Sequence, residues 1–282
     1  MTTQGEIILC NSLSALRLSD SKGNLWQYNS RSDRHSKIAC WAILYDLLMQ
    51  SDLLRQHVAA GKVGYGINHE MRNFRSGMSK NLDLVLCRTS DNPIASKDFA
   101  TLGSEIGVVL NAAQRSKLAA LPRVAEAAVS TVLVAIEAKA CMTEHGKARS
   151  RLHDELSSSF QTIHGDTNSA IAGCFVMVNC SDEFVSSGKN NRPGAAGKYV
   201  VNKHKQPDAA MLTVKGLERV RRRSNEKDDG FDALGMSMVS CRNDGSPVTL
   251  DISMSAKVSG MLSYSDFIHR LAQIYSMRFN AI

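Results

Sequence analysis

Apolar and polar positions along the chain form two kinds of run, one typical of buried strands and the other of amphipathic helices. Residues 131–136 are apolar and mostly β-branched, and the run is long enough for a strand covered on both faces. Residues 170–178 predict a second buried strand. Shorter apolar runs at residues 6–10, 82–86 and 233–239 predict three more.

Helical spacing is clearest in residues 37–60, where Trp41 and Leu44 lie on the apolar side and Gly61 closes the segment. Further helices are predicted over residues 106–120, 144–163 and 264–279, and a turn at residues 243–245 precedes a strand that ends at residue 252. The order helix, strand, insertion, strand, helix, strand predicts an α/β protein with a central mixed β-sheet flanked by helices.

The length of 282 residues and a hydrophobic content of 43% suit a soluble globular protein with a substantial core. We expect a single domain over residues 1–282, with its core at about residues 36–180. Residues 181–282 would form a C-terminal extension of strands and a helix. Residues 181–210 predict a loop, because glycine, serine and asparagine are frequent there.

Charge and cysteine usage narrow the class of protein. The net charge of +7 favours a polyanionic partner. The seven cysteines are scattered and none forms a C-x-x-C pair, so we expect reduced, buried thiols rather than a zinc site. The N-terminus lacks the pattern of a signal peptide, and no apolar run is long enough to span a bilayer. We therefore expect a cytoplasmic protein without a membrane partner.

The end of the run at residues 131–136 carries two opposite charges, Glu137 and Lys139. Side chains alternate across a strand, so both should emerge on one face, roughly 6–7 Å apart. The run at residues 82–86 contains one acid, Asp83, and pairing the two strands would place it beside Glu137. Two carboxylates and a lysine form a site for a hard divalent cation and an activated water. The alternative is a surface ion pair on an edge strand.

This arrangement resembles the PD-(D/E)xK nuclease superfamily, whose signature is an acid on one strand, then Glu or Asp, any residue and Lys on the next. Asp83, Glu137 and Lys139 match these positions, and a long insertion separates the two strands. The resemblance implies a restriction-endonuclease-like fold and a Mg²⁺-dependent endonuclease, with Mn²⁺ able to substitute, that hydrolyses double-stranded DNA as a homodimer. Asp83, Glu137 and the carbonyl of Ala138 would hold the metal, and Lys139 would position the attacking water.

Other polar residues are candidates for the same site. Relatives in the superfamily often add a metal-binding acid from a helix before the first acidic strand, and Glu70 is the candidate here. The alternative is an exposed side chain offset by Arg72 or Arg75. Glu155 and Gln161 lie on the predicted helix after Lys139, but six residues span about 240° net of helical rotation, so both cannot face the metal. A solvated helix face is the alternative for both residues.

Two basic segments are candidates for contact with DNA. Residues 219–223 carry four arginines without an intervening acid: Arg219, Arg221, Arg222 and Arg223. This pattern favours contacts with DNA phosphates, and the alternative is a solvated surface. Lys189 and Arg192 lie in a basic, amide-bearing loop suited to phosphates or base edges.

Nucleotide-dependent chemistry and serine hydrolysis are not indicated. The glycine-rich stretch at residues 194–199 lacks the first Gly of a phosphate loop, and Tyr199 stands where Ser or Thr is required. No Gly-x-Ser-x-Gly sequence occurs. The sequence therefore predicts a metal-dependent endonuclease without a nucleotide cofactor. The alternative function is a catalytically inactive DNA-binding or interaction protein with the same fold.

Overall fold

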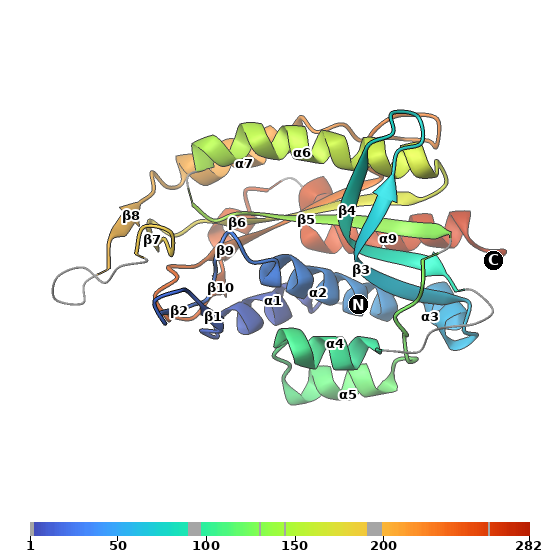
Figure 1. Cartoon of the computed structure of the whole chain (residues 1–282), viewed down its shortest axis with the longest axis horizontal. Coiled ribbons are helices and arrows are strands. Elements are labelled where there is room, and N and C mark those ends of the chain that lie inside the picture. Colours follow the sequence, from blue (N-terminus) through green and yellow to red (C-terminus); the bar gives the residue numbers. More distant parts are fainter. Residues whose placement is uncertain (1–2, 90–96, 130, 144, 191–198, 259) are drawn as a thin grey trace.

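A central mixed β-sheet organises the molecule (Figure 1). The structure, a computed structural model, describes residues 3–89, 97–129, 131–143, 145–190, 199–258 and 260–282. Six strands form the sheet in the order β10-β9-β6-β5-β4-β3. The two central pairings, β5 with β6 and β6 with β9, are parallel, and the outer pairings are antiparallel. The strand bounds are β3 Val63–Arg72, β4 Ser79–Arg88, β5 Val132–Cys141, β6 Ile171–Asn179, β9 Ala233–Ser240 and β10 Thr249–Leu250.

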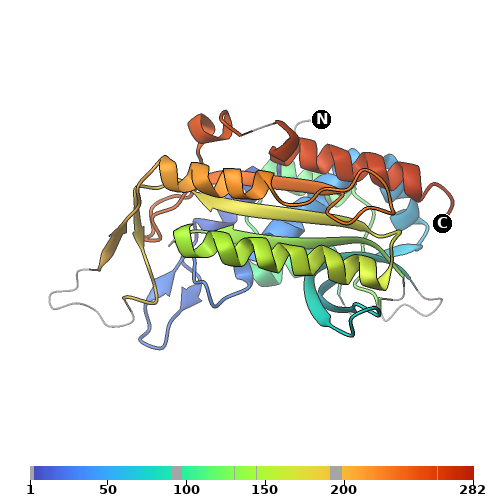
Figure 2. The same cartoon turned by 90° about the horizontal axis from the view of Figure 1, so that it is seen from above.

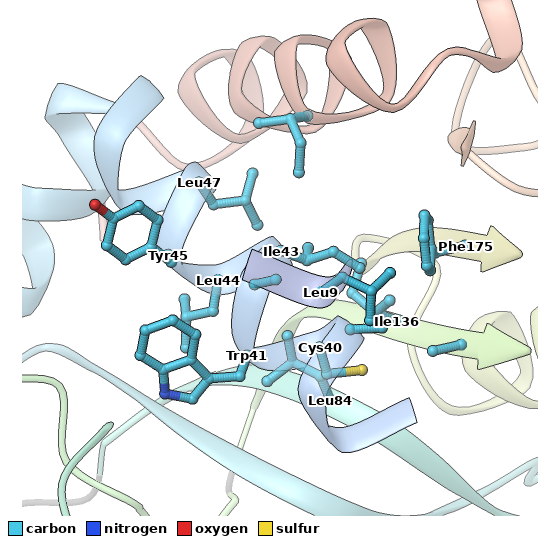
Figure 3. Packing of buried hydrophobic residues seen from close by; sticks show 14 of the residues in the cluster. Leu9, Cys40, Trp41, Ile43, Leu44, Tyr45, Leu47, Leu84, Ile136 and Phe175 are labelled. Carbon is cyan, nitrogen blue, oxygen red and sulfur yellow. The ribbon is translucent and has the colours of Figure 1, made fainter. Parts of the chain in front are cut away.

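Helices cover both faces of this sheet (Figures 1 and 2). One face, called the α2 face here, packs against α1 Gly5–Leu13, α2 Arg34–Gln50 and α9 Tyr264–Arg278. The opposite face, the α6 face, packs against α6 His145–Asp166 and α7 Asp208–Glu218. Because side chains alternate along a strand, β5 sends Ile136 to the α2 face and Ala135 to the α6 face. Figure 3 shows Ile136 and Leu84 of the sheet against Cys40 of α2.

The remaining elements lie outside these two layers. Figure 1 shows α4 Phe99–Ile106 and α5 Ala112–Ala120 on the side of α2 away from the sheet. Phe99 stacks on Trp41 of α2, with ring centroids 4.4 Å apart and planes at 11°. Two small antiparallel pairs of strands lie beside the central sheet: β1 Leu18–Ser19 with β2 Leu25–Trp26, and β7 Glu183–Val185 with β8 Val201–Lys203. The remaining helices are α3 Asp52–Ala59, α8 Ile252–Ser255 and the 3₁₀ helix Gly260–Leu262.

The predicted α/β class and most of the predicted core elements are confirmed. Apolar runs correspond to β4, β5, β6 and β9, and the predicted helices at residues 144–163 and 264–279 correspond to α6 and α9. The helix predicted at residues 37–60 is divided into α2 and α3 at Ser51, whose side chain accepts a hydrogen bond from the Leu54 amide and so begins a new helix.

Four predictions of secondary structure are wrong. Residues 6–10 belong to α1, whose first turn is held by the Asp46 carboxylate accepting hydrogen bonds from the amides of Gln4 and Gly5. The helix predicted at residues 106–120 begins only at Ala112 as α5, and Ile106 is the last residue of α4, which ends because Gly107 adopts a φ of +76°. The loop predicted at residues 181–210 contains β7 and β8, and Ile252 begins α8 instead of ending a strand.

The C-terminal segment contributes directly to the sheet. β9 pairs with β6 along Gly173–Asn179, and β10 pairs with β9. The central sheet is therefore not confined to residues 36–180. No helix within the described ranges is long and apolar enough to cross a membrane.

Candidate active site

β4 and β5 separate at the position of the predicted acids. Their antiparallel pairing runs as far as Leu84 opposite Ile136, and Asp83 and Glu137 are the next residues beyond this pair. The Asp83 side chain enters the gap between the strands, where its Oδ2 accepts a hydrogen bond of 2.8 Å from the Ala138 amide. The structure thus brings together the three residues that the sequence singled out.

Glu137 is almost completely buried, with 1% of its side chain exposed. Its Oε1 lies 2.5 Å from Lys139 Nζ and 3.5 Å from Lys80 Nζ. Its Oε2 is also buried but has no hydrogen-bond partner within the described part of the chain. Because β5 lies between β4 and β6, the alternative of a surface ion pair on an edge strand is wrong.

Lys80 is a member of this cluster that sequence reasoning missed. It lies on β4 three residues before Asp83, and its Nζ donates to Ser159 Oγ at 2.6 Å and to the Glu155 carbonyl at 2.8 Å. Both partners belong to α6, more than seventy residues away in the sequence. No local pattern links these positions, so only the folded chain shows the contact. We call Asp83, Glu137, Lys139 and Lys80 the acid–lysine cluster.

The environment raises the pKa of Asp83 to about 6. Burial is the main cause and the negative charge of Glu137 adds to it, while hydrogen bonds from the Ala138 amide and the Ser36 side chain oppose it. Ser36 lies in the first turn of α2, so the positive end of that helix also faces the acid. Burial lowers the pKa of Lys139, but the charges of Glu137 and Asp83 outweigh this effect and raise it above its usual value.

His35 is a second residue at this site that sequence reasoning missed. Burial and the charge of Lys139 lower its pKa to about 4, so the imidazole is neutral at pH 7. Its ring lies 4.9 Å from that of Tyr28, and its Nδ1 is buried without a hydrogen-bond partner in the described part of the chain. His35 and Ser36 together make the N-terminus of α2 one wall of the site.

The donor atoms of the cluster fit a hard divalent cation. Mg²⁺ in proteins is commonly held by one or two carboxylates and completes its shell with water and substrate phosphate. Asp83 and Glu137 supply two carboxylates, and the buried, unsatisfied Oε2 of Glu137 is an acceptor that a cation would satisfy. Within the described residues, no three His, Cys, Asp or Glu side chains cluster as metal ligands.

The other residues proposed for the site have different positions. Glu70 is exposed on β3, opposite Asn81 of β4, so the helix expected around it is a strand. Glu155 reaches the cluster, because its Oε2 lies 3.5 Å from Lys139 Nζ. Gln161 is exposed further along α6, and its carbonyl accepts a hydrogen bond from Asn73.

The predicted DNA-contacting residues are divided between surface and interior. Arg219, Arg221 and Arg222 are exposed after the end of α7. The prediction that Arg223 contacts DNA is wrong. Its side chain is completely buried and hydrogen-bonded to Asp232 and to backbone carbonyls, so DNA phosphates cannot reach it. Lys189 is exposed and donates to Asn202 at 2.7 Å. Arg192 lies outside the described residues.

The fold and the site define an α/β protein with buried acids and partly exposed lysines where two central strands separate. Comparison with family models, with curated proteins and with solved structures found no match to this chain. The side-chain geometry of the acid–lysine cluster is therefore the basis for inferring a function.

Proposed function

We propose that the protein is a Mg²⁺-dependent endodeoxyribonuclease with a restriction-endonuclease-like fold, which hydrolyses phosphodiester bonds of duplex DNA. One observation carries the proposal: Asp83 and Glu137 converge where β4 and β5 separate, and Glu137 keeps a buried oxygen without a partner among the described residues. A carboxylate held in this way costs free energy unless it binds something. A divalent cation beside a lysine satisfies it and supplies phosphodiester chemistry.

Each residue of the cluster would have a separate task. Asp83, Glu137 and the Ala138 carbonyl would hold a cation that acidifies a bound water and neutralises charge on the scissile phosphate. Lys139 would orient the attacking water and stabilise charge on the phosphate oxygens. The hydrogen bond from the Ala138 amide holds Asp83 in the gap between the strands. Asp83 must be ionised to act, so we expect activity to fall below about pH 6.

Surface charge supports a DNA substrate. The chain carries a net charge of +7, and the exposed Arg219, Arg221 and Arg222 are available for phosphate contacts. Lys189 adds an exposed cation next to the β7–β8 hairpin. Cutting both strands of a duplex requires two sites, and we propose that the active form is a homodimer.

The test is plasmid nicking with purified protein in Mg²⁺, in Ca²⁺ and in excess EDTA, with sequencing of the cut ends. We expect cutting in Mg²⁺ or Mn²⁺ with 5′-phosphate ends, and none in Ca²⁺ or EDTA. Asp83→Asn should be inactive, and Asp154→Asn on the exposed face of α6 is the matched control that should cut normally. DNA binding without cutting would indicate an inactive DNA-binding protein, and neither activity would indicate an interaction protein. Either result would overturn the proposal.

A further inference from the structure

The two lysines beside Glu137 are held in different ways, and this difference suggests separate roles. We infer that Lys80 is a positioning residue. Its ammonium group balances the charge of Glu137 Oε1 from the α6 side, so that Oε2 is available to bind the metal. Lys139 can then move from the carboxylate to contact the attacking water and the phosphate. The inference rests on the proposed nuclease function and adds a residue to its machinery.

Lys80 is anchored to α6 through most of its hydrogen-bonding capacity. An ammonium group has three N–H donors. Lys80 gives one to Ser159 Oγ at 2.6 Å and one to the Glu155 carbonyl at 2.8 Å. Ser159 is fully buried and donates its own hydroxyl proton to the same Glu155 carbonyl, so its oxygen is set to accept from the lysine. Lys80 Nζ also forms an ion pair with Glu137 Oε1 at 3.5 Å.

Lys139 has only carboxylate oxygens among its salt-bridge partners in the described part of the chain, Glu137 Oε1 at 2.5 Å and Glu155 Oε2 at 3.5 Å. An ammonium whose partners are carboxylates can exchange one of them for a phosphate oxygen while it keeps its charge balanced. If Lys139 were the only cation beside Glu137, its departure would leave a buried carboxylate oxygen uncompensated, which is costly. Lys80 removes that cost because it remains on Oε1.

The two oxygens of Glu137 have different surroundings, which suits them to different partners. Both lysines approach Oε1, and Oε2 has no partner in the described part of the chain. A carboxylate with one oxygen held by a fixed cation has a defined orientation, so its second oxygen has a defined direction. Lys80 therefore acts through Glu137, and its own ammonium is too fully engaged with α6 to bind substrate.

The experiment compares Lys80→Met with wild type and with Lys22→Met, an exposed lysine in the turn between β1 and β2 that serves as a matched control. Mn²⁺ affinity is measured by electron paramagnetic resonance without DNA, and nicking rates are measured over a range of DNA concentrations at saturating Mg²⁺. Lys80→Met should nick about tenfold or more slowly, with the KM for DNA unchanged. Its Mn²⁺ affinity should fall below that of wild type, since Glu137 Oε2 loses the direction that Lys80 gives it. Ser159→Ala, which loosens Lys80 but keeps its charge, should give an intermediate rate.

A normal nicking rate in Lys80→Met would overturn the inference. A raised KM with unchanged kcat would also overturn it, because Lys80 would then be a phosphate contact. Mn²⁺ affinity equal to that of wild type would overturn it as well, because Glu137 would then keep its orientation without Lys80. Wild-type protein that neither nicks DNA nor binds Mn²⁺ would overturn the nuclease function itself, and this outcome is visible before any variant is made.

Discussion

The molecule buries two clusters of opposite charges against the same sheet, and they are built in opposite ways. In the first, Asp232 lies immediately before β9 and is 2% exposed. Its Oδ2 accepts hydrogen bonds of 2.8 Å from both Arg223 and the Ala172 amide, and its Oδ1 accepts one of 2.6 Å from Arg278. In the acid–lysine cluster, Glu137 is buried to the same degree but has one unsatisfied oxygen in the described structure. Both oxygens of Asp232 therefore have partners, and the buried atom without one in this cluster is a donor, Arg223 Nε, whereas in the acid–lysine cluster it is the carboxylate oxygen Oε2 of Glu137.

The pKa values express the same difference. Burial raises the pKa of Asp232, but hydrogen bonds from Arg223, Arg278 and the Ala172 amide outweigh it, and the pKa lies below its usual value. The pKa of Asp83 is raised to about 6, because burial and the negative charge of Glu137 outweigh the groups that stabilise the ionised carboxylate. A buried acid with a lowered pKa contributes to stability at neutral pH, whereas one with a raised pKa reduces it. The difference distinguishes a structural ion pair from a candidate active site.

Breaking the Asp232 cluster should have the largest effect on stability. Asp232→Ala leaves the fully buried Arg223 guanidinium without its carboxylate, and we expect a loss of about 3–5 kcal/mol in the free energy of unfolding, measured by urea denaturation. Glu226→Ala, which removes a half-exposed partner of Arg278, is the control and should cost less than about 1 kcal/mol. Equal losses in the two variants would contradict the contrast between buried and exposed pairs.

The acid–lysine cluster should show the reverse pattern. Glu137→Ala and Lys139→Ala should each reduce nicking at least about 100-fold, because charge on the phosphate is no longer stabilised. Both should stay folded and bind DNA, with unfolding free energies within about 1 kcal/mol of wild type, because Lys80 and Lys139 are partly exposed and reach water. A variant that keeps more than a few per cent of wild-type nicking would show that the site assignment is wrong.

The pH dependence of stability gives a separate test of the raised pKa of Asp83. The folded pKa of Asp83, about 6, exceeds its unfolded value near 3.8, so wild type loses stability as pH rises from about 4 to 6. Asp83→Asn lacks this loss and keeps an acceptor for the Ala138 amide. In EDTA at pH 7.5, its free energy of unfolding should exceed that of wild type by at most about 3 kcal/mol, measured by thermal denaturation. The difference between the two proteins should disappear near pH 4. A gap that widens on acidification would contradict the raised pKa.

The exposed arginines should give the smallest effect. Replacing Arg219, Arg221 and Arg222 with Ala should weaken binding to specific and random DNA alike and flatten log K against log salt by up to about 2–3 units. Catalysis at saturating DNA should change little. The control is a second exposed triplet from the α5 region, Arg115, Lys117 and Arg123, replaced in the same way. An unchanged salt slope in the first variant would assign these arginines to a solvated surface.

The sequence predicted what depends on local pattern. β5 and β6 are continuous apolar runs because they are buried on both faces, and the position of Glu137 and Lys139 at the end of such a run located the site. α7 had a usable signal that was not recognised, since Ala210, Val214 and Leu217 are spaced as one buried helix face.

Contacts between distant segments could not be predicted in this way. Residues 6–10 have the composition of a strand, yet they form a helix because Asp46 caps its first turn and Ile8 and Leu9 pack in the α2-face core. Arg223 looks like its exposed neighbours in the sequence, and only the fold places it beside Asp232. Lys80 joins the site through α6, and no spacing in the sequence reports that contact.

The place of β9 in the sheet bears on which stretch of the chain could fold alone. β6 pairs with β5 on one side and with β9 on the other, and all nine of its residues are buried. A fragment ending near residue 180 would turn β6 into an exposed apolar edge, which is a template for aggregation. It would also lose α9, which carries Arg278 to Asp232. The strands that carry the acid–lysine cluster, β4 and β5, therefore depend on the C-terminal hundred residues for protection against aggregation, even though no residue of the cluster lies there.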